Sequence, residues 1–453
     1  MSERVERSLA WMLPSIGAAL FFALWLDYRD FWLDDSFITF RYARNWADGL
    51  GPSFNPGEAV EGYTTFSWLV LVAIAFSLLP EASVLAFVKL SGLGLGLWVL
   101  WRSYSFPGPS GEPRRRFWIL LLAANPVFVA NCGDGMETPL FMLLLLECAR
   151  ASLAPPSARG GAWVGVLAAA CIWTRPEALP LLGGLPLVVL GFHGRAALPW
   201  LRGFALASLP LVVGHFAWRL GYYGAVLPNT FYAKASGDLL ARITRGVADL
   251  GAFLSVDHGV PAVGVWIAGA LAVFGLVRRQ DAGQWLTLLW GIIGFRIAFD
   301  LWSGSEAMGT FRFLAPALPA LFVLADEAAR SLAGLRARVA LAAGAAGLAF
   351  SVWGHSALGQ ARGHYAEGLE QAHWALGKWL AESQPDGTWL AVGDAGVVPF
   401  VSRLPVIDLW GLADAHIARL PGEYGDRPGT ADYVLARRPE VIVIWNLVPI
   451  GKQ

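Results

Sequence analysis

The sequence is poor in charge and in cysteine, and each shortage excludes a class of protein. Charged residues make up 15% of the 453 positions, with 34 basic against 34 acidic side chains, whereas soluble domains carry about 25%. The balanced charge provides no basic surface for nucleic acid. The three cysteines show no paired spacing, so they give neither a disulfide framework nor a metal signature. Internal repeats and low-complexity segments are also absent from the sequence.

The sequence is instead rich in apolar residues and in tryptophan. Hydrophobic residues reach 56%, the mean hydropathy is +0.51, and there are 22 tryptophans. A soluble core cannot enclose this much apolar surface, and tryptophan is enriched at membrane interfaces. The composition therefore predicts an α-helical polytopic membrane protein.

Apolar runs recur along the first 353 residues, and a membrane-spanning helix needs about 20 of them. Arg4 and Arg7 precede the first run, which has no small-residue cleavage site, so we expect a retained anchor with a cytoplasmic N-terminus. Residues 64–80 decide the topology. Only an interfacial or re-entrant helix there places every arginine-rich loop, including 102–116, in the cytoplasm. About eleven spans then remain, near residues 8–26, 82–101, 117–131, 138–153, 161–175, 177–192, 199–218, 258–277, 284–301, 313–329 and 338–353.

The remaining segments differ in composition from the spans and the basic loops. The loops assigned to the outer side are acidic, aromatic and rich in glycine, and they comprise residues 27–80, 132–137, 174–177, 221–257 and 302–312. After residue 353 the long apolar runs end. A helical stretch at 355–384 is followed by short apolar strands at 388–392, 405–409 and 440–445. We therefore predict a transmembrane domain over residues 1–353, with interfacial helices in the loop 27–80, and a small extracytoplasmic α/β domain over 354–453.

The first outer loop carries the strongest chemical signal, because Asp34 and Asp35 follow the first span closely. Paired carboxylates at a membrane face have three uses. One of them can act as a general base on a hydroxyl, both can ligate a divalent cation, or they can cap the helix that begins beside them. Repulsion between two adjacent carboxylates would raise one pKa, and a nearby cation would relieve it. The sequence leaves these uses open.

The residues after this pair predict a short amphipathic helix. Its aromatic side chains, Phe37, Phe40, Tyr42 and Trp46, are available for the membrane interface. Arg41 and Arg44 can contact lipid headgroups or the phosphate of a donor substrate. Glu61 and Tyr63 close the loop, and Glu61 is a further carboxylate that can converge on the same site.

The run DDSFITFRYARNWADGLGPSFNPGEAVEGYT at 34–64 resembles the first extracytoplasmic loop of the GT-C superfamily of polyprenyl-phosphate-dependent glycosyltransferases, and most closely the AftB-like arabinofuranosyltransferases. One departure affects the last outer loop, where Ser303, Gly304, Ser305 and Glu306 stand in place of the family's Gly-Gly-Asp. Shorter matches follow in the family's order, namely GMETPL (135–140), RPE (175–177), LPNTFYAK (227–234), FRFLAPALP (311–319), GDAGVVPF (393–400) and IDLWGLAD (407–414).

The resemblance implies that Asp34 or Asp35 deprotonates the acceptor hydroxyl and that cations stabilise the leaving phosphate. The candidate cations are Lys89, Arg175, Lys234 and Arg312. Snorkelling would account for Lys89 equally well, and a helix-end anchor role would account for Arg175 equally well. Three aspartates follow the strand-like runs, namely Asp394, Asp408 and Asp414. For each of them, turn formation is a simpler explanation than contact with a carbohydrate. The predicted substrate-binding residues are Arg41, Arg44, Glu61, Tyr63, Lys89, Glu137, Arg175, Asn229, Tyr232, Lys234, Glu306 and Arg312.

The resemblance thus implies a GT-C-like glycosyltransferase of the bacterial inner membrane, with an extracytoplasmic active site and a role in cell-envelope synthesis. Its expected donor is a polyprenyl-phosphate-linked sugar, arabinofuranose or another pentose. Its expected acceptor is an extracytoplasmic glycan, lipid or protein. We expect contact with membrane lipids and none with nucleic acid. A divalent cation is the one cofactor considered, with Asp34 and Asp35 as its ligands. A transporter of lipid-linked glycans and a non-catalytic scaffold are the alternative classes.

Overall fold

A computed structural model describes residues 3–109, 118–234, 239–254, 283–304, 309–332 and 334–444, together with single positions between 265 and 273. The chain divides into two compact units. The larger unit contains residues 1–31, 85–215 and 239–364, and the smaller unit contains 32–84, 216–238 and 365–453. Each unit is therefore assembled from segments that are far apart in the sequence. The boundary predicted after residue 353 falls within a helix, and the two-domain division remains a prediction.

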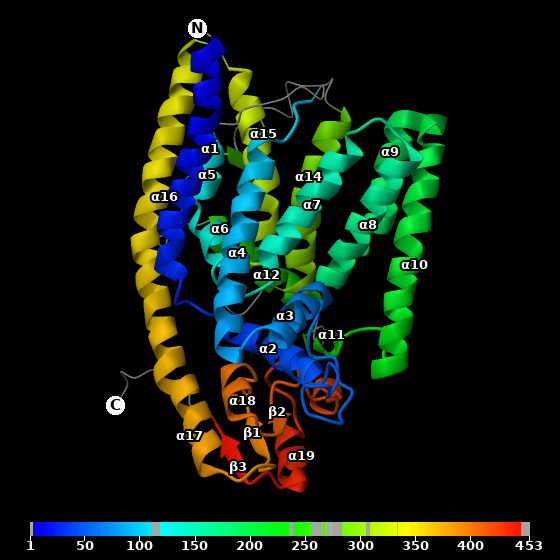
Figure 1. Cartoon of the computed structure of the whole chain (residues 1–453), viewed down its shortest axis with the longest axis vertical. Helices are drawn as coiled ribbons and strands as arrows, with labels where there is room; N and C mark the ends of the chain where they lie inside the picture. The colour runs from blue at the N-terminus through cyan, green and yellow to red at the C-terminus, as the bar shows by residue number, and fades with distance from the viewer. Residues whose placement is uncertain are drawn as a thin grey trace. The chain divides into compact units, whose positions relative to one another are not determined.

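The larger unit is built of helices (Figure 1). Within the described residues, four helical segments are long and apolar enough to cross a membrane, namely Glu81–Tyr104, Pro176–Tyr223, Gly283–Ser303 and Gly334–His355. Most of the predicted span at 258–277 lies outside the described residues. The α-helices that lie wholly or mainly in this unit are α1 (Glu3–Trp25), α4 (Glu81–Tyr104), α5 (Ile119–Ala123), α6 (Pro126–Asn131), α7 (Thr138–Ser152), α8 (Ala158–Thr174), α9 (Leu181–His193), α10 (Leu198–Tyr223), α12 (Leu239–Leu254), α14 (Gly283–Ser303), α15 (Leu318–Arg330) and α16 (Gly334–Gly368).

One predicted span is wrong in its structure. Residues 117–131 do not form a single helix, because α5 ends at Ala123 and α6 begins at Pro126. Asn125 starts α6, since its side-chain oxygen accepts a hydrogen bond from the backbone N–H of Phe128 at 3.0 Å. Proline at the first position of the new helix fixes this break.

The smaller unit combines the first outer loop with the C-terminal part of the chain (Figure 1). Its parallel three-stranded sheet has the order β2-β1-β3, and Ala391 of β1 lies opposite Ile407 of β2 and Ile442 of β3. Three of the strand-like runs predicted from the sequence therefore pair in one sheet. The elements of this unit are α2 (Asp34–Ala47), α3 (Phe66–Leu78), α11 (Asn229–Lys234), the π-helical η5 (Leu369–Trp374), α17 (Ala375–Ser383), β1 (Leu390–Val392), α18 (Val397–Ser402), β2 (Val406–Asp408), η6 (Ile417–Arg419), α19 (Thr430–Arg437) and β3 (Val441–Val443).

The helix at 64–80 is short. α3 has 13 residues, which at 1.5 Å per residue is about 20 Å, less than the roughly 30 Å of a bilayer's hydrocarbon core. Its length thus favours the predicted interfacial or re-entrant position over a span.

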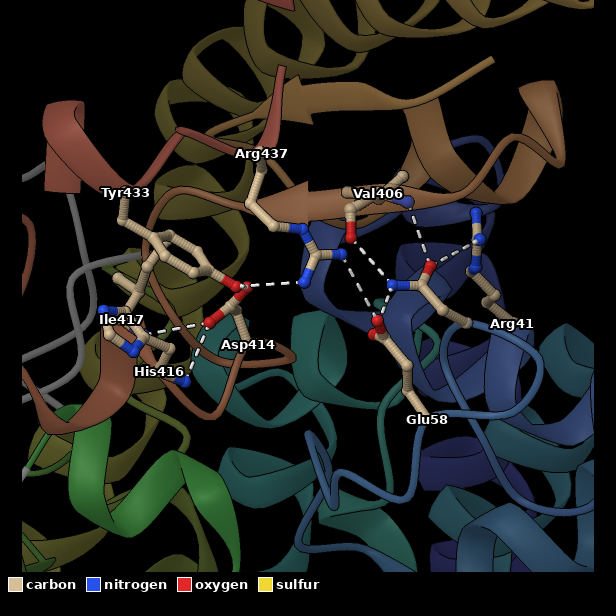
Figure 2. Close-up of polar contacts among 9 residues, drawn as sticks. Arg41, Glu58, Val406, Asp414, His416, Ile417, Tyr433 and Arg437 are labelled. Carbon is tan, nitrogen blue, oxygen red and sulfur yellow. Dashed lines mark hydrogen bonds and ion pairs between the residues drawn. The ribbon is translucent and has the colours of Figure 1, made fainter. Parts of the chain in front are cut away.

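Asn55 of the first loop binds the edge strand of the sheet at Val406, which Figure 2 labels together with Arg41 and Glu58. Its side-chain oxygen accepts from the N–H of Val406 at 3.0 Å, and its side-chain nitrogen donates to the carbonyl of Val406 at 2.8 Å. The same amide contacts Arg41 at 3.3 Å and Glu58 at 2.9 Å. Because β2 is an edge strand, this amide occupies backbone groups that would otherwise be unpaired.

The prediction that the aromatic side chains of α2 serve the membrane interface is wrong. Phe37, Phe40 and Tyr42 are completely buried, and Trp46 is partly buried. Phe37 packs against Phe40 and against rings from the C-terminal part of the chain, with centroids 5.1–5.4 Å apart. Ring–ring packing inside the smaller unit therefore takes the surface that the sequence pattern assigned to lipid.

Candidate functional site

Asp34 is the first residue of α2, where an acidic side chain is favoured by the partial positive charge of the helix N-terminus. Its carboxylate accepts hydrogen bonds from the backbone N–H groups of Gly396 at 3.1 Å and Val397 at 2.8 Å. Its own N–H donates to the hydroxyl of Tyr365 at 3.2 Å. Burial raises the pKa of Asp34 to about 7, although the hydrogen bond from Val397 lowers it.

Asp35 is half-buried, and further groups that titrate surround the acid pair. His373 of η5 forms an ion pair with Asp394, with 2.9 Å between Nε2 and Oδ2. The charge of His373 lowers the pKa of Asp34, while Asp394 and Asp35 raise it. Burial opposes the charged form of His373, but the hydrogen bond to Asp394 and the neighbouring carboxylates outweigh it and raise the pKa of the imidazole.

The two arginines of α2 bind the chain itself. Arg41 donates to the carbonyls of Phe54 at 2.8 Å and Leu404 at 2.7 Å, and burial lowers its pKa to about 9. Arg44 donates to the carbonyl of Phe400 at 2.9 Å, lies over its ring, and forms an ion pair with Glu81 at 3.2 Å. These contacts favour a structural role, and phosphate contact by either arginine stays a prediction.

Glu61 and Tyr63 belong to a second buried polar group in the smaller unit. Arg219 donates two hydrogen bonds to one carboxylate oxygen of Glu61, at 2.8 and 2.9 Å. Burial raises the pKa of Glu61 to about 7, against the lowering effect of Arg219. Tyr63 shares a 3.0 Å hydrogen bond with the hydroxyl of Tyr223. Among the contacts described, Glu61 thus pairs with an arginine rather than with the Asp34 cluster.

The LPNTFYAK motif forms α11. The side-chain nitrogen of Asn229 donates to the carbonyls of Gly411 and Leu412, at 2.9 and 3.0 Å. Tyr232 lies under the guanidinium of Arg419, 4.5 Å from the ring centre. Lys234 is exposed, and its ammonium lies 5.5 Å from the ring centre of Tyr424. Asn229 therefore fixes α11 to the neighbouring turn, while Lys234 presents a charge to the surroundings.

The aspartates after the strands differ in their use. Asp408 accepts from the backbone N–H of Trp410 at 3.0 Å, and Asp414 accepts from that of His416 at 2.9 Å (Figure 2). The predicted turn-forming role is confirmed for these two. Asp394 instead pairs with His373.

In the larger unit, Glu137 and Arg175 form an ion pair with 2.6 Å between their nearest atoms. Arg175 also contacts Glu177 at 3.3 Å, and Glu177 contacts Arg296 at 3.3 Å. Arg296 is completely buried, with its guanidinium 5.3 Å from the ring centre of Phe141. Two arginines and two glutamates thus form one buried network among aromatic rings.

This network retains unused hydrogen-bonding capacity. Within the described residues, one terminal nitrogen of Arg296, Nε of Arg175 and one carboxylate oxygen of Glu137 have no hydrogen-bond partner. One oxygen of the buried Asp134 also has none, and burial raises the pKa of Asp134 to about 7. Buried polar atoms in native proteins usually have partners, so this cluster is suited to a polar ligand.

The other predicted residues of the larger unit lie beside these groups or outside the described part. Lys89 donates to the backbone carbonyls of Tyr28, Phe31 and Gly133, so it joins three chain segments. Arg312 is buried, and its charge lowers the pKa of Asp134. Glu306 lies outside the described residues.

Sequence reasoning missed His373 and Arg296 as members of these clusters. The RPE motif contained Glu177, but its pairing with Arg296 depends on a contact across 119 positions of sequence. A histidine in a helical stretch has no pattern that reveals a partner 21 residues later. Among the residues that the structure describes, no group of three or more His, Cys, Asp or Glu side chains is arranged to hold a metal ion.

Comparison with known sequences gives two results. Residues 362–451 match a family model described as a domain of unknown function (DUF8728). Over 254 residues, or 50% of this chain, the sequence is 34% identical to the terminal β-(1→2)-arabinofuranosyltransferase of Mycobacterium tuberculosis. The chain spans only 39% of that relative's length.

Comparison with solved structures establishes the fold. ArnT from Cupriavidus metallidurans, bound to undecaprenyl phosphate, matches 87% of this chain over 85% of its own, with 12% identity and a TM-score of 0.57. AglB from Archaeoglobus fulgidus, an oligosaccharyltransferase in complex with an inhibitory peptide and a dolichol-phosphate, matches 96% over 67%, with 12% identity and a TM-score of 0.62. The predicted resemblance is confirmed: this multi-pass membrane protein has the GT-C fold and is related in sequence to arabinofuranosyltransferases.

Proposed function

We propose that this protein is a glycosyltransferase that moves a pentose of the arabinofuranose type from a polyprenyl-phosphate donor to an extracytoplasmic glycan, lipid or protein. The acid cluster around Asp34 is the observation that carries the proposal. It places two adjacent carboxylates at the start of α2, in a chain with the GT-C fold and with sequence similarity to an arabinofuranosyltransferase.

We assign the role of general base to Asp35. Both oxygens of the Asp34 carboxylate accept backbone hydrogen bonds, and Asp34 is only 5% exposed. The half-buried Asp35 is more accessible to a substrate. In this reaction the acceptor hydroxyl gives its proton to Asp35 while its oxygen attacks the anomeric carbon, and the polyprenyl phosphate leaves with the electron pair of the broken bond.

The arginine–glutamate network of the larger unit is by itself suited to binding an anion such as a phosphate. Guanidinium groups bind phosphate oxygens through several hydrogen bonds in a fixed geometry. Arg175 and Arg296 both keep donor atoms without partners among the described residues. ArnT and AglB are bound to undecaprenyl phosphate and dolichol-phosphate, which supports a lipid phosphate as the donor here.

Transfer from radiolabelled polyprenyl-phosphate sugars tests the proposal directly. We expect the purified protein in lipid nanodiscs to transfer arabinofuranose to an arabinan acceptor and to discriminate against hexose donors. Transfer of a hexose in preference to a pentose would contradict the sugar assignment. Absence of transfer from every donor, combined with movement of the labelled lipid between leaflets, would favour a transporter.

Cysteine labelling tests the orientation, which places the site outside the cytoplasm. Leu50→Cys and Ala154→Cys each add a thiol at an exposed loop position, while the native cysteines are buried. An impermeant maleimide added to spheroplasts should label position 50 and spare position 154. The opposite pattern would overturn the proposed orientation.

A further inference from the structure

A π-helical segment carries the histidine nearest to the first-loop acids. η5 (Leu369–Trp374) follows α16 and precedes α17, and His373 lies in it. Segments of this kind are rare and occur often at functional sites, because the wider turn re-aims side chains. The edge of Trp374 packs on Phe37 of α2 with centroids 5.4 Å apart, and the hydroxyl of Tyr365, just before η5, accepts from the N–H of Asp34. The segment is therefore attached to the start of α2 on both sides of His373.

One short segment, residues 393–397, contacts both His373 and Asp34. Asp394 pairs with His373 at 2.9 Å, and Gly396 and Val397 donate to the carboxylate of Asp34. A Cβ atom at Gly396 would lie 2.1 Å from the backbone oxygen of Asp34 and 2.3 Å from a carboxylate oxygen. The loop therefore requires glycine at this position to approach α2, and its geometry fixes His373 and Asp34 relative to each other.

The charges around this loop are predominantly negative. Asp34 and Asp35 come from α2, Asp394 from the loop, and Tyr365 from the end of α16. Asp35 and Asp394 both raise the pKa of Asp34, and all three carboxylates raise the pKa of Tyr365. The positive charge of His373 lowers the pKa of Asp34, and a hydrogen bond to the carbonyl of Gly368 raises the pKa of the His373 imidazole. Three carboxylates this close repel one another unless a cation is present or one of them binds a proton.

We propose that His373, oriented by Asp394, is a positioning residue whose imidazolium charge keeps the Asp34–Asp35 pair ionised, so that one of the pair is ready to accept the proton of the acceptor hydroxyl. The proposal rests on the proposed transferase function. The imidazolium keeps its own proton throughout: the acceptor proton moves to the carboxylate, the glycosidic bond forms, and the bond to phosphate breaks. His373 thus takes the place of the cation that the sequence analysis left unidentified.

The pH profile of transfer distinguishes this role from a purely structural one. In His373→Gln the pKa of the catalytic carboxyl should rise. Transfer at pH 6 should therefore fall up to about tenfold for each unit of that rise. Above the pKa of His373 the wild-type ring is neutral too, so the two profiles should converge at alkaline pH. His373→Lys restores a permanent charge and should recover transfer at pH 6. His364→Gln, which changes an exposed histidine at the end of α16, is the control and should follow the wild type.

Three outcomes would overturn the proposal while leaving the transferase function intact. The first is a His373→Gln profile that coincides with the wild type at every pH. The second is a loss of activity by the same factor at every pH, which indicates only a structural role. The third is a wild-type enzyme that EDTA inactivates and Mn²⁺ restores, together with a His373→Gln variant that keeps wild-type transfer in the presence of Mn²⁺. This result would assign the neutralising charge to a metal ion.

Imidazole NMR separates a failure of this inference from a failure of the proposed function. With ¹⁵N-labelled histidine, the His373 resonance, identified by its loss in His373→Gln, should titrate at a higher pH than the imidazole of a histidine in an unstructured peptide. The difference should shrink in Asp394→Asn and in Asp34→Asn. If no donor supports transfer but these shifts occur, the charge pairing stands and the transferase proposal fails. A wild-type His373 that titrates like a histidine in an unstructured peptide would overturn the pairing itself.

Discussion

The two units of the molecule hold buried charge in different ways. In the larger unit, the charges of the buried network alternate in sign and sum to zero, in the order Glu137, Arg175, Glu177 and Arg296. In the smaller unit, three carboxylates face one imidazole, and burial raises the pKa of Asp34 to about 7. Guanidinium groups keep their charge across the physiological pH range, whereas burial brings the pKa of Asp34 close to neutrality. The first arrangement suits binding of a permanent charge such as a phosphate, and the second suits acceptance of a proton.

The largest effect should separate the two adjacent aspartates. Asp35→Asn removes the proposed base, and we expect transfer to fall by about 10²–10⁴-fold with little change in thermal stability. Asp34→Asn replaces one of two acceptor oxygens by a donor that faces a backbone N–H, so it should lower the free energy of unfolding by about 1–3 kcal/mol. Initial rates and thermal unfolding of both variants provide the measurement. An Asp34→Asn protein that folds normally but is inactive, beside an active Asp35→Asn, would reverse the assignment.

The arginine–glutamate network should respond to single and double substitutions in opposite ways. Arg175→Gln leaves the carboxylate of Glu137 buried without its partner, which should cost about 3–5 kcal/mol of stability. Arg175→Gln combined with Glu137→Gln removes both charges and should recover most of that loss. Chemical denaturation in detergent measures both.

An exposed ion pair gives the control for this comparison. Arg29 and Asp30 lie 3.1 Å apart with side chains 65% and 85% exposed. Arg29→Gln should therefore change stability by no more than about 1 kcal/mol. If the protein with both Arg175→Gln and Glu137→Gln is as unstable as Arg175→Gln alone, the guanidinium of Arg175 stabilises the fold through packing on the aromatic rings rather than through charge.

The fold of the smaller unit predicts a smaller effect at Gly396. The added methyl group in Gly396→Ala would overlap Asp34, and overpacking of this kind costs about 1–3 kcal/mol. Transfer should fall with stability, because the loop also carries Asp394. Gly363→Ala is the matched control, since no atom lies within 4 Å of the position that its Cβ would occupy. Equal stability of the two alanine variants would mean that the loop 393–397 moves away from α2 without cost.

Local features of both units follow from the sequence, whereas the clusters do not. The acidic pair marks the start of α2, and β-branched apolar runs give the strands. The pairing of His373 with Asp394 and of Glu177 with Arg296 depends on tertiary packing, which periodicity does not encode. The same limit explains the error at α2. Its aromatic pattern indicates an apolar face but does not distinguish a lipid surface from the rings of Phe400 and Trp374.

Lys234 should give the smallest effect on stability and a clear effect on binding. It is exposed, in contrast to the buried arginines of the larger unit's network, and contacts the ring of Tyr424. Lys234→Gln should change the free energy of unfolding by less than about 0.5 kcal/mol. If Lys234 contacts an anionic substrate, as its motif predicts, KM should rise several-fold at low salt while kcat stays constant. The increase should shrink at 0.5 M salt, because screening weakens exposed charges. Lys234→Arg should restore the wild-type KM. A KM that is unchanged in Lys234→Gln at low salt would assign this lysine to solvation of the surface alone.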